Sequence, residues 1–129
     1  MPVTQMKQKR QPSMEYRTFF RPEDTRTFPK GKVEVVTLGG MTFGKAVLQP
    51  GWRWSTCVQP IAKTRSCEAT HMNLHLSGRM HVKMDDGTER EFGPGDISQL
   101  PPGHDAWVVG NEPAVVIDIS GMTDYAKKR

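Results

Sequence analysis

The sequence has no apolar run near the roughly 18 residues that a membrane-spanning helix needs. No hydrophobic stretch typical of a secretory signal follows Met1. It also has only two cysteines, Cys57 and Cys67, which are too few for a disulfide framework. These absences predict a cytoplasmic protein that does not associate with membranes. In that reducing compartment the cysteines are expected to be free thiols or metal ligands.

Helical periodicity is also scarce. Apart from a turn or two in the C-terminal "MTDYAKKR", no segment carries the apolar stripe of an amphipathic helix, and no internal repeat is present. At 129 residues the chain is long enough for one domain with a real core. The sequence therefore excludes helical bundles and repeat arrays.

The middle of the chain carries no net positive charge. The formal net charge is +4, but residues 1–32 hold eight Lys or Arg and three acidic residues. Residues 33–123 hold seven basic and ten acidic residues, so this part is mildly acidic. Charged ends of this kind are usually solvated, and we expect no binding to nucleic acid.

The rest of the sequence is dominated by patterns that are typical of β-strands. Short apolar or alternating runs end at Gly, Pro or Asp-Gly punctuation from Val33 onward, which is typical of an all-β sandwich or barrel. Asp86-Gly87 is the strongest hairpin signal, because glycine supplies the positive φ that a two-residue turn needs. We predict nine strands, at 33–38, 41–49, 52–58, 71–77, 79–84, 88–92, 96–100, 105–109 and 114–119.

Composition also divides the chain. We predict a flexible N-terminal tail over 1–14, an N-terminal arm over 15–32, the β-barrel over 33–121 and a C-terminal tail over 122–129. The arm is too apolar for a free tail. We expect it to add a strand at an open sheet edge, either on its own barrel or on that of a partner, and we expect a homodimer. The apolar side chains in and next to the arm are Met14, Tyr16, Phe19, Phe20 and Phe28.

The segment "GDISQLPPG" (residues 95–103) carries a Gly, five residues and Pro-x-Gly, and with "LSGRMHV" and "MDDGTEREFGPGD" it resembles the cupin family. The resemblance covers about Val33 to Ile119. It implies an antiparallel jelly roll, or double-stranded β-helix, with a divalent metal at the barrel mouth and a small-molecule ligand. It also implies an oxygenase, isomerase or lyase as possible activities, although fold alone does not choose the reaction.

The metal ligands implied by the resemblance match only in part. Counting back from Gly78, the family's Glu falls on His71, while its paired His positions fall on Cys57 from one side and on Cys67 from the other. Both alignments stay open. The remaining His falls on Ala106, and His104 lies two residues earlier, on the same face if the strand has begun. We therefore predict a site at His71, His104, Cys67 and Cys57, with Zn²⁺ preferred and Fe²⁺ or Ni²⁺ as second choices.

Four more residues are predicted to line a substrate pocket. His75 follows His71 by four residues, about 13 Å along a strand, which is too far for a shared metal, so we assign it to the pocket wall. Asn73 lies between them, and Trp52 and Trp54 would share a strand face. Core packing is at least as good an interpretation of the two tryptophans. The alternative function is a ligand-binding or sensor module that has no metal and no catalysis.

Overall fold

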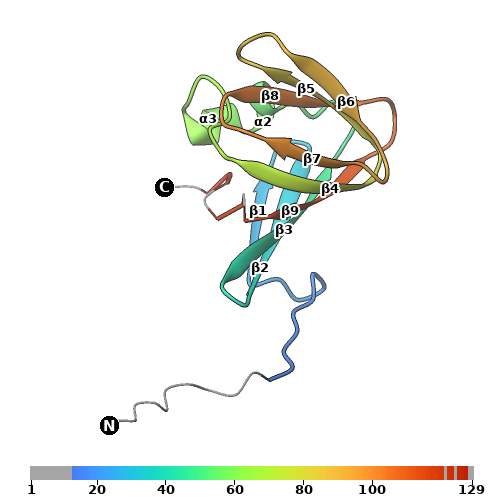
Figure 1. Ribbon diagram of the computed structural model, residues 1–129. Coiled ribbons are helices and arrows are strands. Elements are labelled where there is room, and N and C mark those ends of the chain that lie inside the picture. The colour runs from blue at the N-terminus through green and yellow to red at the C-terminus, as the bar shows by residue number, and fades with distance from the viewer. Residues whose placement is uncertain (1–12, 121, 124, 128–129) are drawn as a thin grey trace.

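The computed structural model describes residues 13–120, 122–123 and 125–127. It is an antiparallel jelly-roll sandwich in which a six-stranded sheet packs against a three-stranded sheet (Figure 1). Within the described residues, hydrogen bonding does not close the two sheets into one barrel. No helix among these residues is long and apolar enough to cross a membrane. The predicted all-β, antiparallel fold class is confirmed.

The larger sheet has the strand order β1-β2-β3-β9-β4-β7, and the smaller has the order β6-β5-β8. The bounds of the larger sheet are β1 (Asp24–Phe28), β2 (Gly31–Leu38), β3 (Met41–Leu48), β9 (Ala114–Ile119), β4 (His71–Ser77) and β7 (Ile97–Leu100). Those of the smaller sheet are β6 (Glu89–Phe92), β5 (Arg79–Met84) and β8 (His104–Val109).

The N-terminal arm contributes a strand to its own chain. Strand β1 pairs with β2 in antiparallel register, Phe28 opposite Gly31, and so extends the larger sheet. Phe28 is buried, whereas Tyr16 and Phe20 are exposed. The sequence around β1 is rich in turn residues, and the one clear core residue of the strand is the last, Phe28. The sequence pattern therefore did not predict this strand.

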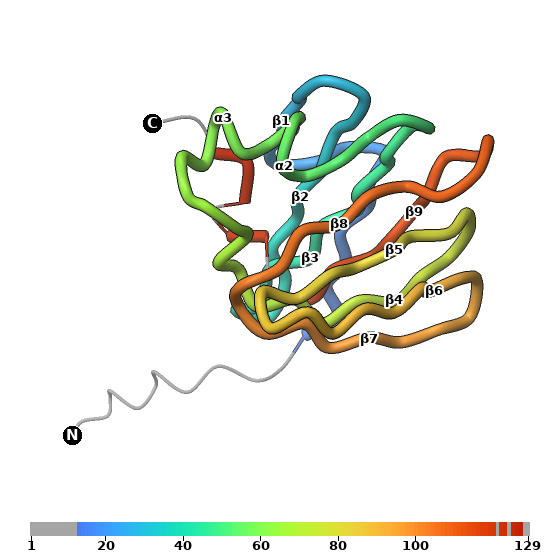
Figure 2. The backbone as a smooth tube through the Cα atoms, turned by 90° about the horizontal axis from the view of Figure 1, so that it is seen from above, coloured from blue at the N-terminus to red at the C-terminus, as the bar shows by residue number. Residues whose placement is uncertain are grey.

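The predicted strand over 52–58 is wrong. The segment forms two single-turn helices, α2 (Trp54–Cys57) and α3 (Gln59–Ala62), at one end of the sandwich (Figure 2). Trp54, Cys57 and Val58 are all buried, and this spacing of three and four residues belongs to a helix. The alternation of large and small residues around Trp52 therefore suggested the two-residue period of a strand, whereas the segment has the period of a helix. Short apolar runs do not distinguish these two periods.

Gly78 marks the step from one sheet to the other. It lies between β4 and β5 with φ of 72°, a conformation that favours glycine. A Cβ at this position would lie 2.2 Å from the carbonyl oxygen of Pro113. The absence of a side chain lets the β4–β5 turn pass against the residues that precede β9.

The described part of the C-terminal segment, residues 122–123 and 125–127, lies against the core. Met122 and Ala126 are buried, and Tyr125 contacts Phe28 edge to face. The Arg26 guanidinium, on β1, donates hydrogen bonds to the main-chain oxygens of Met122, Thr123 and Tyr125 at 2.6–3.0 Å. One arginine therefore fastens the C-terminal segment to the edge of the larger sheet.

This fastening predicts a stability effect. Replacing Arg26 with Ala leaves three main-chain carbonyl oxygens without their charged donor, so we expect a loss of about 2–3 kcal/mol in the free energy of unfolding. Chemical denaturation measures it. Arg17→Ala is the matched control, because its ion pair with Glu23 is exposed and should contribute below about 1 kcal/mol. Equal stability of the two variants would contradict the role given to Arg26.

Candidate metal centre

Cys67 and His104 are brought together by the main chain. The amide of Cys67 donates to the carbonyl oxygen of His104 at 2.8 Å, and the amide of Gly103 donates back to Cys67 at 2.7 Å. Cys67 lies on the loop before β4, and His104 is the first residue of β8, so an isolated β-bridge joins this loop to the smaller sheet. This pairing across a long stretch of sequence sets the thiol beside the imidazole.

His71 completes a group of three. It is the first residue of β4, and its Nε2 lies 3.6 Å from Sγ of Cys67. One ligand atom from each of Cys67, His71 and His104 lies within 4.8 Å of the others, and all three residues are buried. The imidazole rings of His71 and His104 meet edge to face, with centroids 5.3 Å apart. The arrangement is a compact thiol–imidazole–imidazole cluster.

Both imidazoles are held by their Nδ1 atoms. Nδ1 of His104 donates to the carbonyl oxygen of Pro101 at 2.8 Å, and Nδ1 of His71 donates to the carboxylate of Asp118. A carbonyl or carboxylate oxygen can only accept, so each proton is assigned to Nδ1 from its partner. This leaves both Nε2 atoms as the ligating positions, the arrangement that histidine ligands of metals commonly have.

The pKa values of Cys67 and His71 are both strongly shifted from their ordinary values. Burial opposes ionisation of Cys67, but hydrogen bonds from His104 and His71 outweigh it and lower the pKa of the thiol to about 6. Burial also opposes protonation of His71, but the Asp118 carboxylate and the Cys67 thiol outweigh it and raise its pKa to about 9. Near neutral pH the thiolate form of Cys67 and the protonated form of His71 are therefore favoured, and a metal that binds here would displace the proton from Nε2 of His71.

Two residues of the site were not predicted. Asp118 on β9 is fully buried and contacts His71, and Tyr125 lies edge-on to the same ring with centroids 5.5 Å apart. Asp118 carried a signal in the sequence, because it falls on the inward face of the apolar "AVVIDI" run, where an unpaired acid would be costly. Tyr125 carried none, since its segment had been assigned to a tail.

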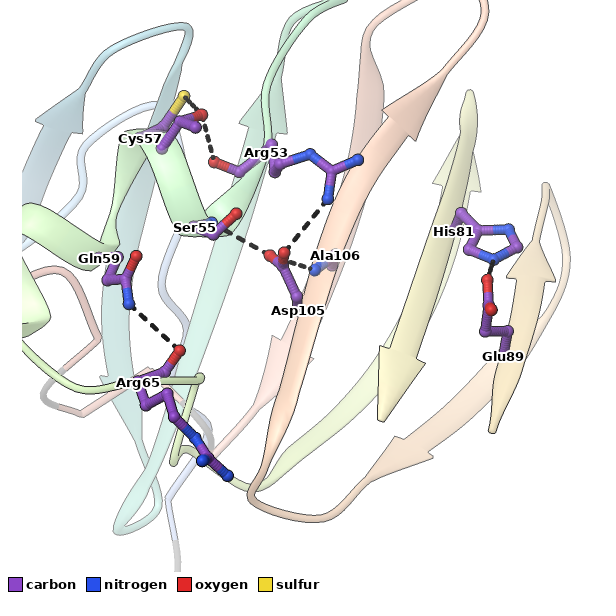
Figure 3. A network of polar contacts seen from close by, with 10 residues as sticks. Arg53, Ser55, Cys57, Gln59, Arg65, His81, Glu89, Asp105 and Ala106 are labelled. Atoms are coloured by element: carbon purple, nitrogen blue, oxygen red, sulfur yellow. Dashed lines mark hydrogen bonds and ion pairs between the residues drawn. The ribbon is translucent and has the colours of Figure 1, made fainter. Parts of the chain in front are cut away.

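Cys57 does not join the cluster. It ends α2, where its Sγ lies 3.6 Å from the Thr56 hydroxyl (Figure 3). The start of α2 is held on β8 by Asp105, which accepts hydrogen bonds from the amide of Ser55 and the guanidinium of Arg53.

His81 also lies away from the cluster. It occupies the smaller sheet, bonded to Glu89 at 2.7 Å and stacked on Trp107. Both contacts are on the side of β5 that points away from the buried residues Met80 and Val82. His81 is therefore a natural control residue for experiments on the cluster.

The four residues predicted for a substrate pocket all line one small cavity between the sheets. The cavity has a volume of about 50 Å³ and is shared with the three cluster residues. His75 donates or accepts a hydrogen bond with Ser98 at 2.9 Å and stacks on Phe92. The other members of the predicted set are Trp52, Trp54 and Asn73.

A larger pocket leads from the surface to this cavity. Its volume is about 390 Å³, and its walls include the C-terminal segment and both short helices. Trp54, Cys67 and Tyr125 line the surface pocket and the inner cavity alike. Cys67 therefore lies between the surface pocket and the smaller cavity, whereas His71 and His104 border the smaller cavity alone.

The donor set suits a borderline metal ion. One thiolate and two imidazoles are the ligand types of Zn²⁺ sites, and three protein ligands leave one tetrahedral position for water or substrate. Asp118 and Pro101 orient the imidazoles through their Nδ1 atoms, as hydrogen-bond partners of ligating histidines do. The chemistry of these residues fits the metal that the sequence predicted.

Known structures resemble this one in fold. A protein of unknown function from Rhizobium leguminosarum bv. viciae 3841 superposes with a TM-score of 0.62 at 22% identity, over 84% of this chain and 97% of that one. A cupin 2 conserved barrel domain protein from Salinispora arenicola gives 0.59 at 18% identity, over 84% and 88%. The fold is that of a cupin.

A third similar structure is the polyketide cyclase RemF of Streptomyces resistomycificus, at a TM-score of 0.59 and 15% identity over 84% of this chain and 79% of that one. No protein-family model and no curated protein matches the sequence. At these identities the likeness establishes the cupin fold and nothing about the activity.

The shifted thiol predicts a titration. In the metal-free protein, the ultraviolet absorbance of the thiolate should rise with a midpoint near pH 6. His104→Ala should move the midpoint upward toward the ordinary value of 9.0, because a hydrogen bond that stabilises the thiolate is gone. Cys57→Ser should keep the step near pH 6. A step that survives in Cys67→Ser would show that another group produces it.

Proposed function

We propose that this chain is a metal-dependent cupin enzyme that binds a divalent ion, Zn²⁺ by preference, through Cys67, His71 and His104. The observation that carries the proposal is the convergence of these three donors within 4.8 Å in a buried position next to a pocket. Fe²⁺ and Ni²⁺ are the second choices for a mixed nitrogen and sulfur set. The substrate is a small organic molecule.

The bound metal would polarise an oxygen of the substrate or activate a water molecule. The residues of the chain provide the rest. Asp118 keeps Nδ1 of His71 protonated and its ring in place, and the carbonyl oxygen of Pro101 does the same for His104. Tyr125 covers one side of His71 and separates it from bulk water. The surface pocket admits the substrate to the cluster.

The reaction class follows from this arrangement only in outline. Among the described residues that line the cavity, His75 is the one buried acid or base outside the set already assigned, and burial lowers its pKa. A neutral imidazole that lines the same cavity as the metal ligands is suited to move a proton of a substrate bound there, which favours isomerase or lyase chemistry. The polyketide cyclase among the similar folds is consistent with a small organic substrate. A non-catalytic ligand sensor is the alternative.

A second catalytic function is favoured by one specific contact. Nε2 of His71 lies 3.6 Å from Sγ of Cys67 while its Nδ1 contacts Asp118, the order of groups in a cysteine nucleophile with its base and orienting acid. The presence of His104 favours the metal site, because a cysteine nucleophile needs only one imidazole as its base and Cys67 has two imidazoles beside it. If Cys67 is a nucleophile, it should react rapidly and stoichiometrically with an alkylating reagent, and bound zinc should not slow this reaction.

The metal site is tested by metal analysis of protein purified without an affinity tag. We expect about one equivalent per chain in the wild type and a loss of at least tenfold in metal affinity in His71→Ala, His104→Ala or Cys67→Ser, because each change removes one of three protein ligands.

Two controls separate ligation from general damage. Cys57→Ser and His81→Ala should keep the full metal content, since both residues lie away from the cluster. An unchanged metal content in the His71→Ala, His104→Ala double variant would remove the site from these residues. So would a bound metal that is lost in the Cys57 variant and kept in the Cys67 variant.

We further propose that the chain acts in the cytoplasm as a homodimer. Both cysteines are free, which suits a reducing compartment. The outer face of β4 and β7 is apolar: Leu74 and Ile97 lie opposite each other in register and are 37% and 72% exposed. Because β7 is an edge strand, a second copy of this face is the simplest cover.

The dimer is tested by light scattering at micromolar concentration. A Leu74→Arg, Ile97→Arg variant should be monomeric, because it places two like charges on each half of a self-complementary face. Lys83→Arg, on the smaller sheet, is the control and should remain dimeric. A monomeric wild type would contradict the proposal.

A further inference from the structure

One buried polar atom that lines the inner cavity has no hydrogen-bond partner among the described residues. Nε1 of Trp52 is the one buried side-chain nitrogen or oxygen that lacks a hydrogen bond among the described residues, although Trp52 is only 2% exposed. The amide of Asn73, on a side chain that is 8% exposed, makes no hydrogen bond within the part of the chain that the structure describes, and its atoms are not fully buried. A buried donor without a partner is costly, so such groups call for an explanation.

Both groups line the cavity that contains the metal cluster. Trp52, Asn73, Cys67, His71 and His104 all border the same space of about 50 Å³. The indole N–H can only donate, so its partner must be an acceptor atom. The Asn73 amide can donate or accept and so can serve a second atom of the same ligand. The cavity thus offers hydrogen bonds and a metal position to one bound group.

Size and charge narrow the class of ligand. A water molecule needs roughly 10–15 Å³ of such space, so the cavity takes a group of about three to five non-hydrogen atoms. Among the described residues that line it, none is Lys or Arg. A doubly charged phosphate would therefore be poorly compensated, whereas a singly charged carboxylate is offset by the metal.

We propose that the cavity binds the carboxylate of the substrate, with one oxygen toward the metal and the other accepting a hydrogen bond from Nε1 of Trp52, while the amide of Asn73 holds the same group. This assigns the substrate class as small organic acids and rests on the proposed metal function. The remainder of a longer acid extends past Cys67 into the surface pocket of about 390 Å³.

The test uses the full-length, ¹⁵N-labelled, zinc-loaded protein titrated with acetate. The chain has three tryptophans, so three indole N–H resonances report. We expect the Trp52 resonance to shift with saturation and the Trp107 resonance, on the smaller sheet, to stay in place. Inorganic phosphate should leave the Trp52 resonance unmoved.

Variants then separate recognition from metal binding. Trp52→Phe and Asn73→Leu should each weaken acetate binding by about tenfold or more, the effect of losing a hydrogen bond to a charged group, with zinc content unchanged. The chemical shifts of the backbone amides measure both acetate binding and the integrity of the fold. Trp107→Phe is the matched control and should bind acetate with wild-type affinity.

The outcomes distinguish the two proposals. Zinc binding without a Trp52 shift, or wild-type acetate affinity in Trp52→Phe, overturns the carboxylate site alone. An equal shift with phosphate overturns the assigned class. A wild-type protein that binds no zinc overturns the proposed function and this inference together.

Discussion

The buried contact between Asp118 and His71 is the constraint on which the site depends. Asp118 is fully buried on β9, and a carboxylate there is tolerable only with hydrogen-bonding or charged partners. His71 on the neighbouring strand β4 supplies one of them through Nδ1. That choice of nitrogen turns Nε2 toward Cys67, so satisfying a buried acid also creates the ligand geometry of the cluster.

The third ligand of the cluster, His104, comes from the smaller sheet. His104 starts β8, and its main chain pairs with that of Cys67 on the loop before β4. The C-terminal segment, fastened by Arg26, then lays Tyr125 over His71. Ligands, orienting groups and cover thus come from chain segments that only the packed sandwich brings together. This arrangement gives one small, largely apolar cavity that is bordered by the three candidate metal ligands.

Much of this was accessible from the sequence, and the limits have physical causes. Turn chemistry and alternation located eight of the nine strands of the structure, because glycine and proline punctuation is local information. The choice between Cys57 and Cys67 stayed open, since it depends on a β-bridge to His104 that local pattern does not encode. The period of two assigned to Trp52–Val58 concealed a helix. Asp118 was visible in the sequence only as an acid in an apolar run.

X-ray absorption spectroscopy on the zinc-loaded, full-length protein tests the central claim most directly, because it reads the ligand atoms themselves. The account predicts one sulfur at about 2.3 Å and two imidazole nitrogens at about 2.0–2.1 Å, with a light atom in the remaining position. A zinc environment that contains no sulfur, or two sulfurs, would contradict the assignment of Cys67, His71 and His104.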